Sequence, residues 1–145
     1  MSAVIPRHRV NVLTGIKSAR LIEDPAEYAD LIKKAKRPLL VVGPLLLASR
    51  ADGRFLLENA LEIAKACNIP ICATAQTKGK IVGLGVQPDS VYDVVEIVNA
   101  LKDPDWKGVK KEGNHDLVMF LGIRSDFENQ SLSVLKHFAF KHLKT

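Results

Sequence analysis

Basic and hydroxyl side chains follow three short apolar segments of this chain, at residues 39–42, 70–74 and 117–121. Cationic side chains, hydroxyl groups and glycines that let the backbone come close are the groups that bind phosphate in proteins. The pattern therefore indicates a site for the phosphates of a nucleotide or dinucleotide. Its candidate residues are Gly43, Pro44, Ser49, Arg50, Thr74, Lys78, Gly79, Gly122, Arg124 and Ser125.

A plainer interpretation of the same residues stays open. Loops are usually polar, and a chain with a pI near 9.3 has lysines on most of its surface, so composition alone favours an ordinary solvated edge. The turn Gly43-Pro44-Leu45-Leu46 also lacks the second glycine of the G-x-G-x-x-G phosphate fingerprint.

The sequence predicts no catalytic group and no metal site. Its four histidines have no metal-ligand spacing, and two cysteines cannot supply the four thiolates of an iron–sulfur cluster. Ser49 and Ser125 lack the setting of a nucleophile. Each histidine is expected to be a solvated or capping side chain, and Cys67 and Cys72 to be buried and reduced, as in a cytoplasmic protein.

Length and composition limit the other function classes. A chain of 145 residues with 47% hydrophobic and 26% charged residues is expected to fold as one domain. The net charge of +5 is spread along the chain and aromatics make up 6%, which argues against a nucleic-acid partner. The most apolar stretch, residues 39–48, is broken by Gly43-Pro44 and is too short to span a membrane. No export signal is apparent in residues 1–12, so the expected location is the cytoplasm.

The apolar spacing predicts alternating helices and strands. The run Asp24-Pro25-Ala26-Glu27 is a capping signal for a helix over residues 25 to about 36. The three apolar segments are expected to be buried strands, with a weaker further strand at 81–86. Other helices are expected from about 55 to 68, from Ser90 to before Pro104 with Val91, Val94, Val95, Val98 and Leu101 buried, and around Leu132 to Ala139. Residues 76–80 are expected to form a turn, and 103–114 an exposed loop.

Strands that alternate with helices lie parallel in one sheet, joined by right-handed crossovers. The predicted fold is therefore an α/β protein with an open parallel sheet and helices on both faces, forming a single domain over 1–145 in which 1–23 is an extended N-terminal segment. The loops 43–53, 74–80 and 122–129 should meet at the edge where the strands end. Trp106 is equally consistent with a partner anchor and with a lid over the sheet edge.

Three segments resemble the central domain of thiamine-diphosphate enzymes: Ala35 to Gly43, Asn68 to Thr74 with Lys78-Gly79-Lys80, and His115 to Arg124. The resemblance implies a three-layer Rossmann-like fold of the DHS-like NAD/FAD-binding type. It also implies that Arg124 faces the dinucleotide of FAD, with Thr74 and Lys78 nearby. The flanking domains of those enzymes and their Gly-Asp-Gly motif are missing, so the chain is not a whole enzyme of that group.

The whole chain, including residues 103–108 and 130–139, is more specifically similar to the epsilon subunit family of archaeal carbon monoxide dehydrogenase/acetyl-CoA decarbonylase/synthase. That resemblance implies a non-catalytic accessory subunit that stabilises the large nickel–iron–sulfur alpha subunit in an alpha2epsilon2 assembly and assists electron transfer to FAD. It implies no metal in this chain and no tightly bound cofactor. The alternative is a stand-alone FAD or nucleotide-binding module. Because this fold usually adds another strand after the last predicted helix, either the sheet is smaller or the chain is truncated.

Overall fold

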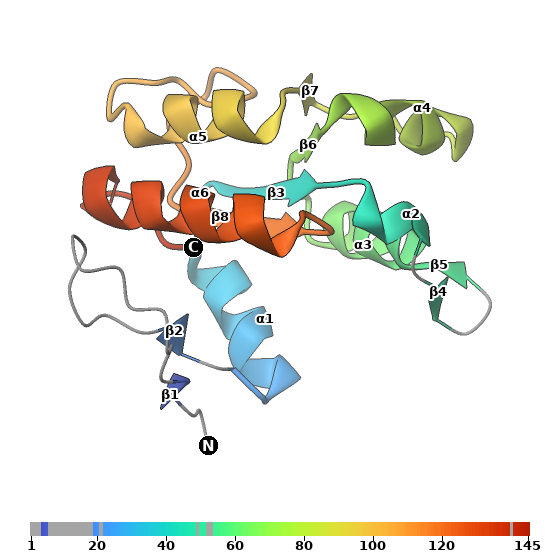
Figure 1. Ribbon diagram of the computed structural model, residues 1–145, viewed down its shortest axis with the longest axis horizontal. Helices are drawn as coiled ribbons and strands as arrows, with labels where there is room; N and C mark the ends of the chain where they lie inside the picture. The colour runs from blue at the N-terminus through green and yellow to red at the C-terminus, as the bar shows by residue number, and fades with distance from the viewer. Residues whose placement is uncertain (1–3, 6–18, 21, 49, 52–53, 140) are drawn as a thin grey trace. The chain divides into compact units, whose positions relative to one another are not determined.

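The computed structural model describes residues 4–5, 19–20, 22–48, 50–51, 54–139 and 141–145. The chain divides into two compact units, Met1–Lys36 and Arg37–Thr145. In the first unit, β1 (Val4–Ile5) and β2 (Ala19–Arg20) pair antiparallel, and α1 (Pro25–Lys34) follows (Figure 1). The side chain of Asp24 accepts a hydrogen bond from the Ala26 amide at 2.9 Å, so the predicted helix start is confirmed.

The second unit is built on a four-stranded parallel sheet, as predicted. Its strands are β3 (Pro38–Val42), β6 (Ile71–Ala73), β7 (Ser90–Val91) and β8 (Leu117–Leu121), in the order β7-β6-β3-β8. The short apolar runs form strands because side chains on both faces of the sheet are covered, as the near-complete burial of residues 39–42 and 71–73 shows.

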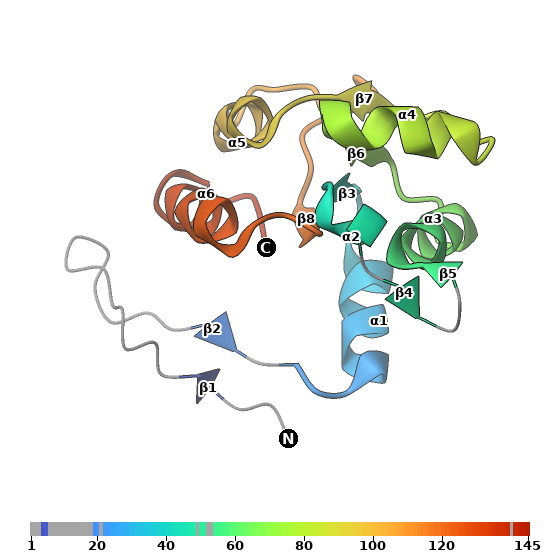
Figure 2. The same ribbon diagram turned by 45° about the vertical axis from the view of Figure 1, so that its right-hand side comes forward.

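Helices cover both faces of this sheet. Figure 2 shows α3 (Leu56–Ala66) and α4 (Ala75–Gly83) on one side, and α5 (Val94–Lys102) and α6 (Ser125–Phe138) on the other. A core cluster joins Leu39 and Val41 of the sheet to Leu101 of α5 and Leu135 of α6. The predicted three-layer α/β architecture is therefore confirmed. Between β3 and α3 lie α2 (Leu45–Ala48), β4 (Arg50–Ala51) and β5 (Arg54–Phe55).

The strand order gives the sheet a switch point between β3 and β8. The chain adds β6 and then β7 on one side of β3, and it then returns to place β8 on the other side. In open parallel sheets, ligands bind beyond the carboxyl ends of the strands at such a point. The edge of interest is therefore the one that Gly43 and Gly122 occupy.

Two predictions for residues 76–86 are wrong. Residues 76–80 form helix α4 instead of a turn, and the segment 81–86 contains the end of that helix instead of a strand. Thr77 and Ile81 of α4 are fully buried, so the lysines and glycines that suggest a turn belong to its solvent face. The strand after β6 is β7, two residues held by pairing with Cys72 and Ala73.

The next helix begins at Val94 instead of Ser90. Asp93 accepts from the Glu96 amide at 2.8 Å, and Glu96 accepts from the Asp93 amide at 3.2 Å, which is a complete capping box. Val91 and Val95 are therefore exposed, at 39% and 61%, and the buried stripe includes Ile97. The expected burial of Val91 and Val95 is wrong because the helix starts one turn later.

The last helix begins at Ser125, earlier than predicted, and this shortens the expected loop 122–129. After α6 the backbone returns to the sheet, where Lys144 forms a parallel bridge with Leu117. The Val118 amide donates to the Lys144 carbonyl at 2.8 Å, and the Lys144 amide donates to the Asp116 carbonyl at 2.9 Å. Lys144 thus lies in the position of a further strand beside β8.

Candidate functional site

Most of the predicted site residues lie at the carboxyl edge of the sheet or on the helices that start there. They are Gly43 and Pro44 after β3, Thr74 after β6, Gly122, Arg124 and Ser125 after β8, and Lys78 and Gly79 one turn into α4. Ser49 lies outside the described residues, and of Arg50 only the backbone of β4 is described. Parallel pairing brings these segments together because strands that run the same way end on the same side.

At the switch point, the loops after β3 and β8 pack directly against each other. The Gly43 amide donates to the Leu121 carbonyl at 2.8 Å, and the Leu45 amide donates to the Gly122 carbonyl at 3.0 Å. A Cβ atom on Gly43 would lie 2.6 Å from the Gly122 oxygen, which is closer than packed atoms come. These glycines therefore let the two loops approach each other, and backbone fills the base of the switch point.

The start of α4 carries a buried pair of hydroxyl groups. Thr74 is the N-cap residue, yet its side chain makes no capping hydrogen bond. Its Oγ1 lies instead 2.7 Å from Oγ1 of Thr77, and both side chains are buried. Each hydroxyl therefore satisfies the other, while Lys78 on the next position is exposed to solvent.

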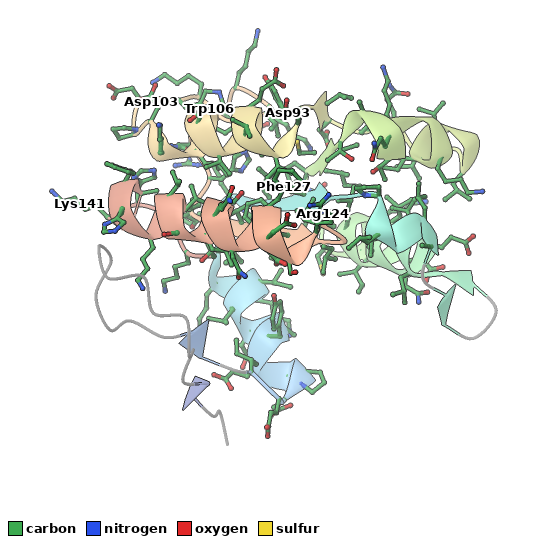
Figure 3. The ribbon with its side chains drawn as sticks, in the orientation of Figure 1. Asp93, Asp103, Trp106, Arg124, Phe127 and Lys141 are labelled. Atoms are coloured by element: carbon green, nitrogen blue, oxygen red, sulfur yellow. The ribbon has the colours of Figure 1, made fainter. Side chains whose placement is uncertain are left out.

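Arg124, the N-cap residue of α6, is exposed and already paired. Its Nε donates to Oδ1 of Asp126 at 3.1 Å, and its guanidinium lies 4.9 Å from the centre of the Phe127 ring. Figure 3 shows Arg124 and Phe127 near the same end of α6. The hydrogen bond from Arg124 lowers the pKa of the Asp126 carboxyl. An anionic ligand would have to compete with that carboxylate, but an ion pair this exposed offers little resistance.

A second network lies at the opposite, amino edge of the sheet and is built around the buried His115. The His115 Nδ1 lies 3.0 Å from the Arg37 carbonyl, and its Nε2 accepts from the Val109 amide at 3.2 Å. These partners require the neutral ring with its proton on Nδ1. The predicted loop 103–114 contains no helix or strand, and His115, which follows it, bonds to the residue just before β3.

The indole of Trp106 lies 5.6 Å from the His115 ring and packs on the core. Since His115 bonds to the residue just before β3, Trp106 is at the amino edge. The hypothesis that Trp106 covers the carboxyl edge is therefore wrong.

His115 should make the stability of the fold depend on pH. Burial lowers its pKa below the ordinary value of 6.5, so the unfolded chain binds a proton more readily than the folded one. The stabilisation is complete above about pH 6.5 and should be lost progressively as the pH falls from there through the lower pKa of the folded chain. Urea unfolding between about pH 7.5 and about pH 5.5 should show a larger loss for the wild-type chain than for a His115→Gln variant. Equal losses in both chains would contradict this prediction.

The remaining histidines and cysteines have separate roles. His142 Nε2 lies 2.9 Å from the Leu101 carbonyl in the last turn of α5, so His142 is a capping side chain, whereas His137 is exposed. Burial raises the pKa of the Cys72 thiol, but Cys67 is exposed, so its expected burial is wrong.

Within the described ranges, no three His, Cys, Asp or Glu side chains come together as a metal site. Likewise, no described helix is long and apolar enough to cross a bilayer.

Sequence reasoning did not identify two side chains that shape the carboxyl edge, Asp126 and Phe127. Both residues lie in the predicted loop 122–129. Extending α6 back to Ser125 places Asp126 and Phe127 in its first turn. The signal that could have revealed this is the acidic pair Asp126 and Glu128, because acidic residues favour the first turn of a helix.

The fold and the residues at its carboxyl edge define an α/β protein with an open four-stranded parallel sheet covered by helices on both faces. Residues 2–145 match the family described as CO dehydrogenase beta subunit/acetyl-CoA synthase epsilon subunit, and the chain belongs to this family.

Curated relatives agree with the family match. The chain is 43% identical over 134 residues to the acetyl-CoA decarbonylase/synthase complex subunit epsilon of Methanothermobacter thermautotrophicus, covering 92% of this chain and 73% of the relative. It is 38% identical over 132 residues to subunit epsilon 1 of the complex in Methanosarcina barkeri, covering 90% and 72%. For subunit epsilon of Methanothrix soehngenii, the identity is 40% over 116 residues, covering 79% and 59%.

Proposed function

We propose that the chain is a non-catalytic accessory subunit of the CO dehydrogenase component of an acetyl-CoA decarbonylase/synthase complex in the cytoplasm. In this role it binds the large nickel–iron–sulfur alpha subunit in an alpha2epsilon2 assembly and stabilises it. Family membership over residues 2–145 is the observation that carries the proposal.

The hydrogen-bonding partners of the polar side chains support an accessory role over a catalytic one. His115 and His142 bond to backbone groups, and the Thr74 and Thr77 hydroxyls bond to each other. A catalytic group needs a partner that leaves it available to the substrate. These groups are instead engaged in holding the fold together.

The test is reconstitution with a purified nickel–iron–sulfur alpha subunit. The two proteins should elute together in size-exclusion chromatography, and the chain alone should show no CO oxidation. A binding partner present at about 100 times its Kd adds ~2.7 kcal/mol to the stability of the protein it binds. CO oxidation by the alpha subunit should therefore survive heating longer when the chain is added. Separate elution, or CO oxidation by the isolated chain, would contradict the proposal.

A second candidate function is the binding of FAD, through which the subunit would assist electron transfer. What supports it is the convergence of Thr74, Lys78 and Arg124 at the carboxyl edge, where the N-termini of α4 and α6 also lie. The diphosphate of FAD would take the place of Asp126 beside Arg124, since a guanidinium binds phosphate in the same forked geometry as a carboxylate.

This candidate predicts that adding the chain to FAD changes the flavin fluorescence. Arg124→Ala should weaken FAD binding about tenfold, because it removes a charged phosphate contact. Lys65→Ala on α3 removes an exposed cation away from this edge and serves as the control. A titration that shows no change at high micromolar protein, or equal affinities for both variants, would remove FAD from consideration.

A further inference from the structure

The end of α6 carries a large apolar side chain that its own fold leaves uncovered. Phe138 is 68% exposed, although Leu135 and Ala139 on the same helix are buried against α5 and the sheet. Phe138 lies beside that buried stripe in the last turn of α6. Because α5 ends at Lys102, its end places a lysine near the Phe138 ring instead of an apolar side chain that would bury it.

A lysine and an imidazole lie beside this ring. The Nζ of Lys102 lies 5.8 Å from the centre of the Phe138 ring, and the His137 ring lies 6.0 Å from it. Lys141 follows three residues later in the sequence, beyond the end of α6, and is exposed, and residues 130–145 contain no aspartate or glutamate. Asp103 lies just after α5, but its Oδ1 accepts a hydrogen bond from the Asp105 amide. We call Lys102, His137, Phe138 and Lys141 the Phe138 patch.

The helix dipole explains the cations near the ends of the helices but not the exposed phenylalanine beside them. Cations near the C-terminus of a helix interact favourably with its dipole, which accounts for Lys102 in the last turn of α5 and Lys136 in the last turn of α6. That effect gives no reason for a phenylalanine to remain in water among them. An exposed aromatic ring beside basic side chains is instead typical of the anchor of a protein–protein contact.

We propose that the Phe138 patch is a docking surface for an acidic segment of the large partner subunit, with Phe138 inserting against an apolar side chain of that segment. The inference rests on the proposed function, since it takes the alpha subunit as the partner. Charge complementarity selects carboxylates as the groups opposite Lys102 and Lys141. Figure 3 shows Lys141 at the end of α6 opposite to Arg124, so the patch is separate from the carboxyl-edge site.

The experiment measures the affinity of the full chain for the purified alpha subunit. The double variant Phe138→Ser/Lys141→Glu removes the ring and reverses one charge, and it should bind at least about tenfold more weakly. Its matched control is Ile63→Ser/Lys65→Glu on α3, where Ile63 is 54% exposed, and this variant should bind like the wild-type chain. Phe138→Tyr keeps the ring and should retain most of the affinity, which separates docking from misfolding.

The dependence of this affinity on salt concentration provides a second measurement. The affinity of the wild-type chain should fall between about 50 mM and about 500 mM salt, and it should fall less for Lys141→Glu. Equal affinities for the double variant and its α3 control would overturn the docking surface while leaving the proposed function intact. No binding by the wild-type chain would overturn both. Binding of the patch to a mixed-sequence DNA duplex, with unchanged affinity of the double variant for the alpha subunit, would also overturn this inference.

Discussion

A Gly122→Val substitution should lower the free energy of unfolding by about 3 to 5 kcal/mol. Gly122 has a φ of +73°, a backbone conformation that β-branched residues rarely adopt. A Cβ atom there would lie 2.5 Å from Leu46 Cγ and 2.9 Å from the Gly43 oxygen, so the loops after β3 and β8 would have to separate. Urea unfolding measures the loss, which is a large part of the stability of a typical domain.

The matched control for this prediction is Gly83→Ala in α4. No atom lies within 4 Å of a Cβ atom built on Gly83, and the residue is helical, so alanine should be neutral or stabilise the fold by up to about 1 kcal/mol. If both variants unfold at the wild-type urea concentration, the close packing of the two loops does not contribute to stability as described.

A Leu101→Ala substitution should cost about 3 kcal/mol of unfolding free energy. Leu101 is fully buried in the last turn of α5 and belongs to the core cluster that joins α5, α6 and the sheet. Alanine would leave a cavity that the surrounding side chains cannot fill without moving. Chemical denaturation should therefore show a lower midpoint with an unchanged slope.

Val95→Ala is the control on the same helix. Val95 is 61% exposed, so losing its methyl groups should change the stability by no more than about 0.5 kcal/mol. A comparable loss in both variants would mean that burial of the side chain in the core does not determine the effect. That outcome would contradict the assignment of α5 as a helix held by its buried stripe.

The main strands could be predicted because their signal is local. The apolar runs 39–42 and 117–121 are too short for a buried helix, and both lie in strands, although Leu121 at the end of β8 is 38% exposed. Strand β7 has no such signal, because it consists of Ser90 and Val91 and exists only through pairing with β6. Helix α4 was missed for a related reason: its buried side consists mainly of Thr77 and Ile81, too few residues to mark a helical period.

The placement of the candidate site at one edge follows from the parallel sheet, and to that extent the sequence predicts it. The approach of Gly43 to Gly122 could not be predicted, since it depends on β8 lying next to β3. The pairing of Arg124 with Asp126 and Phe127 required the true start of α6. Such details are set by tertiary packing, which a local pattern of residue types does not encode.

The strand order also determines which strands of the sheet can pair first while the chain is being synthesised. Leu40 can pair with Ile71 soon after both residues have left the ribosome. The other edge of β3 stays unpaired until Leu117 and the residues that follow it have also been synthesised. During that interval an almost wholly apolar strand presents unpaired backbone groups to its surroundings, and open strands of this kind pair readily with other chains. A nascent chain should therefore be most prone to aggregate just before residue 117 leaves the ribosome.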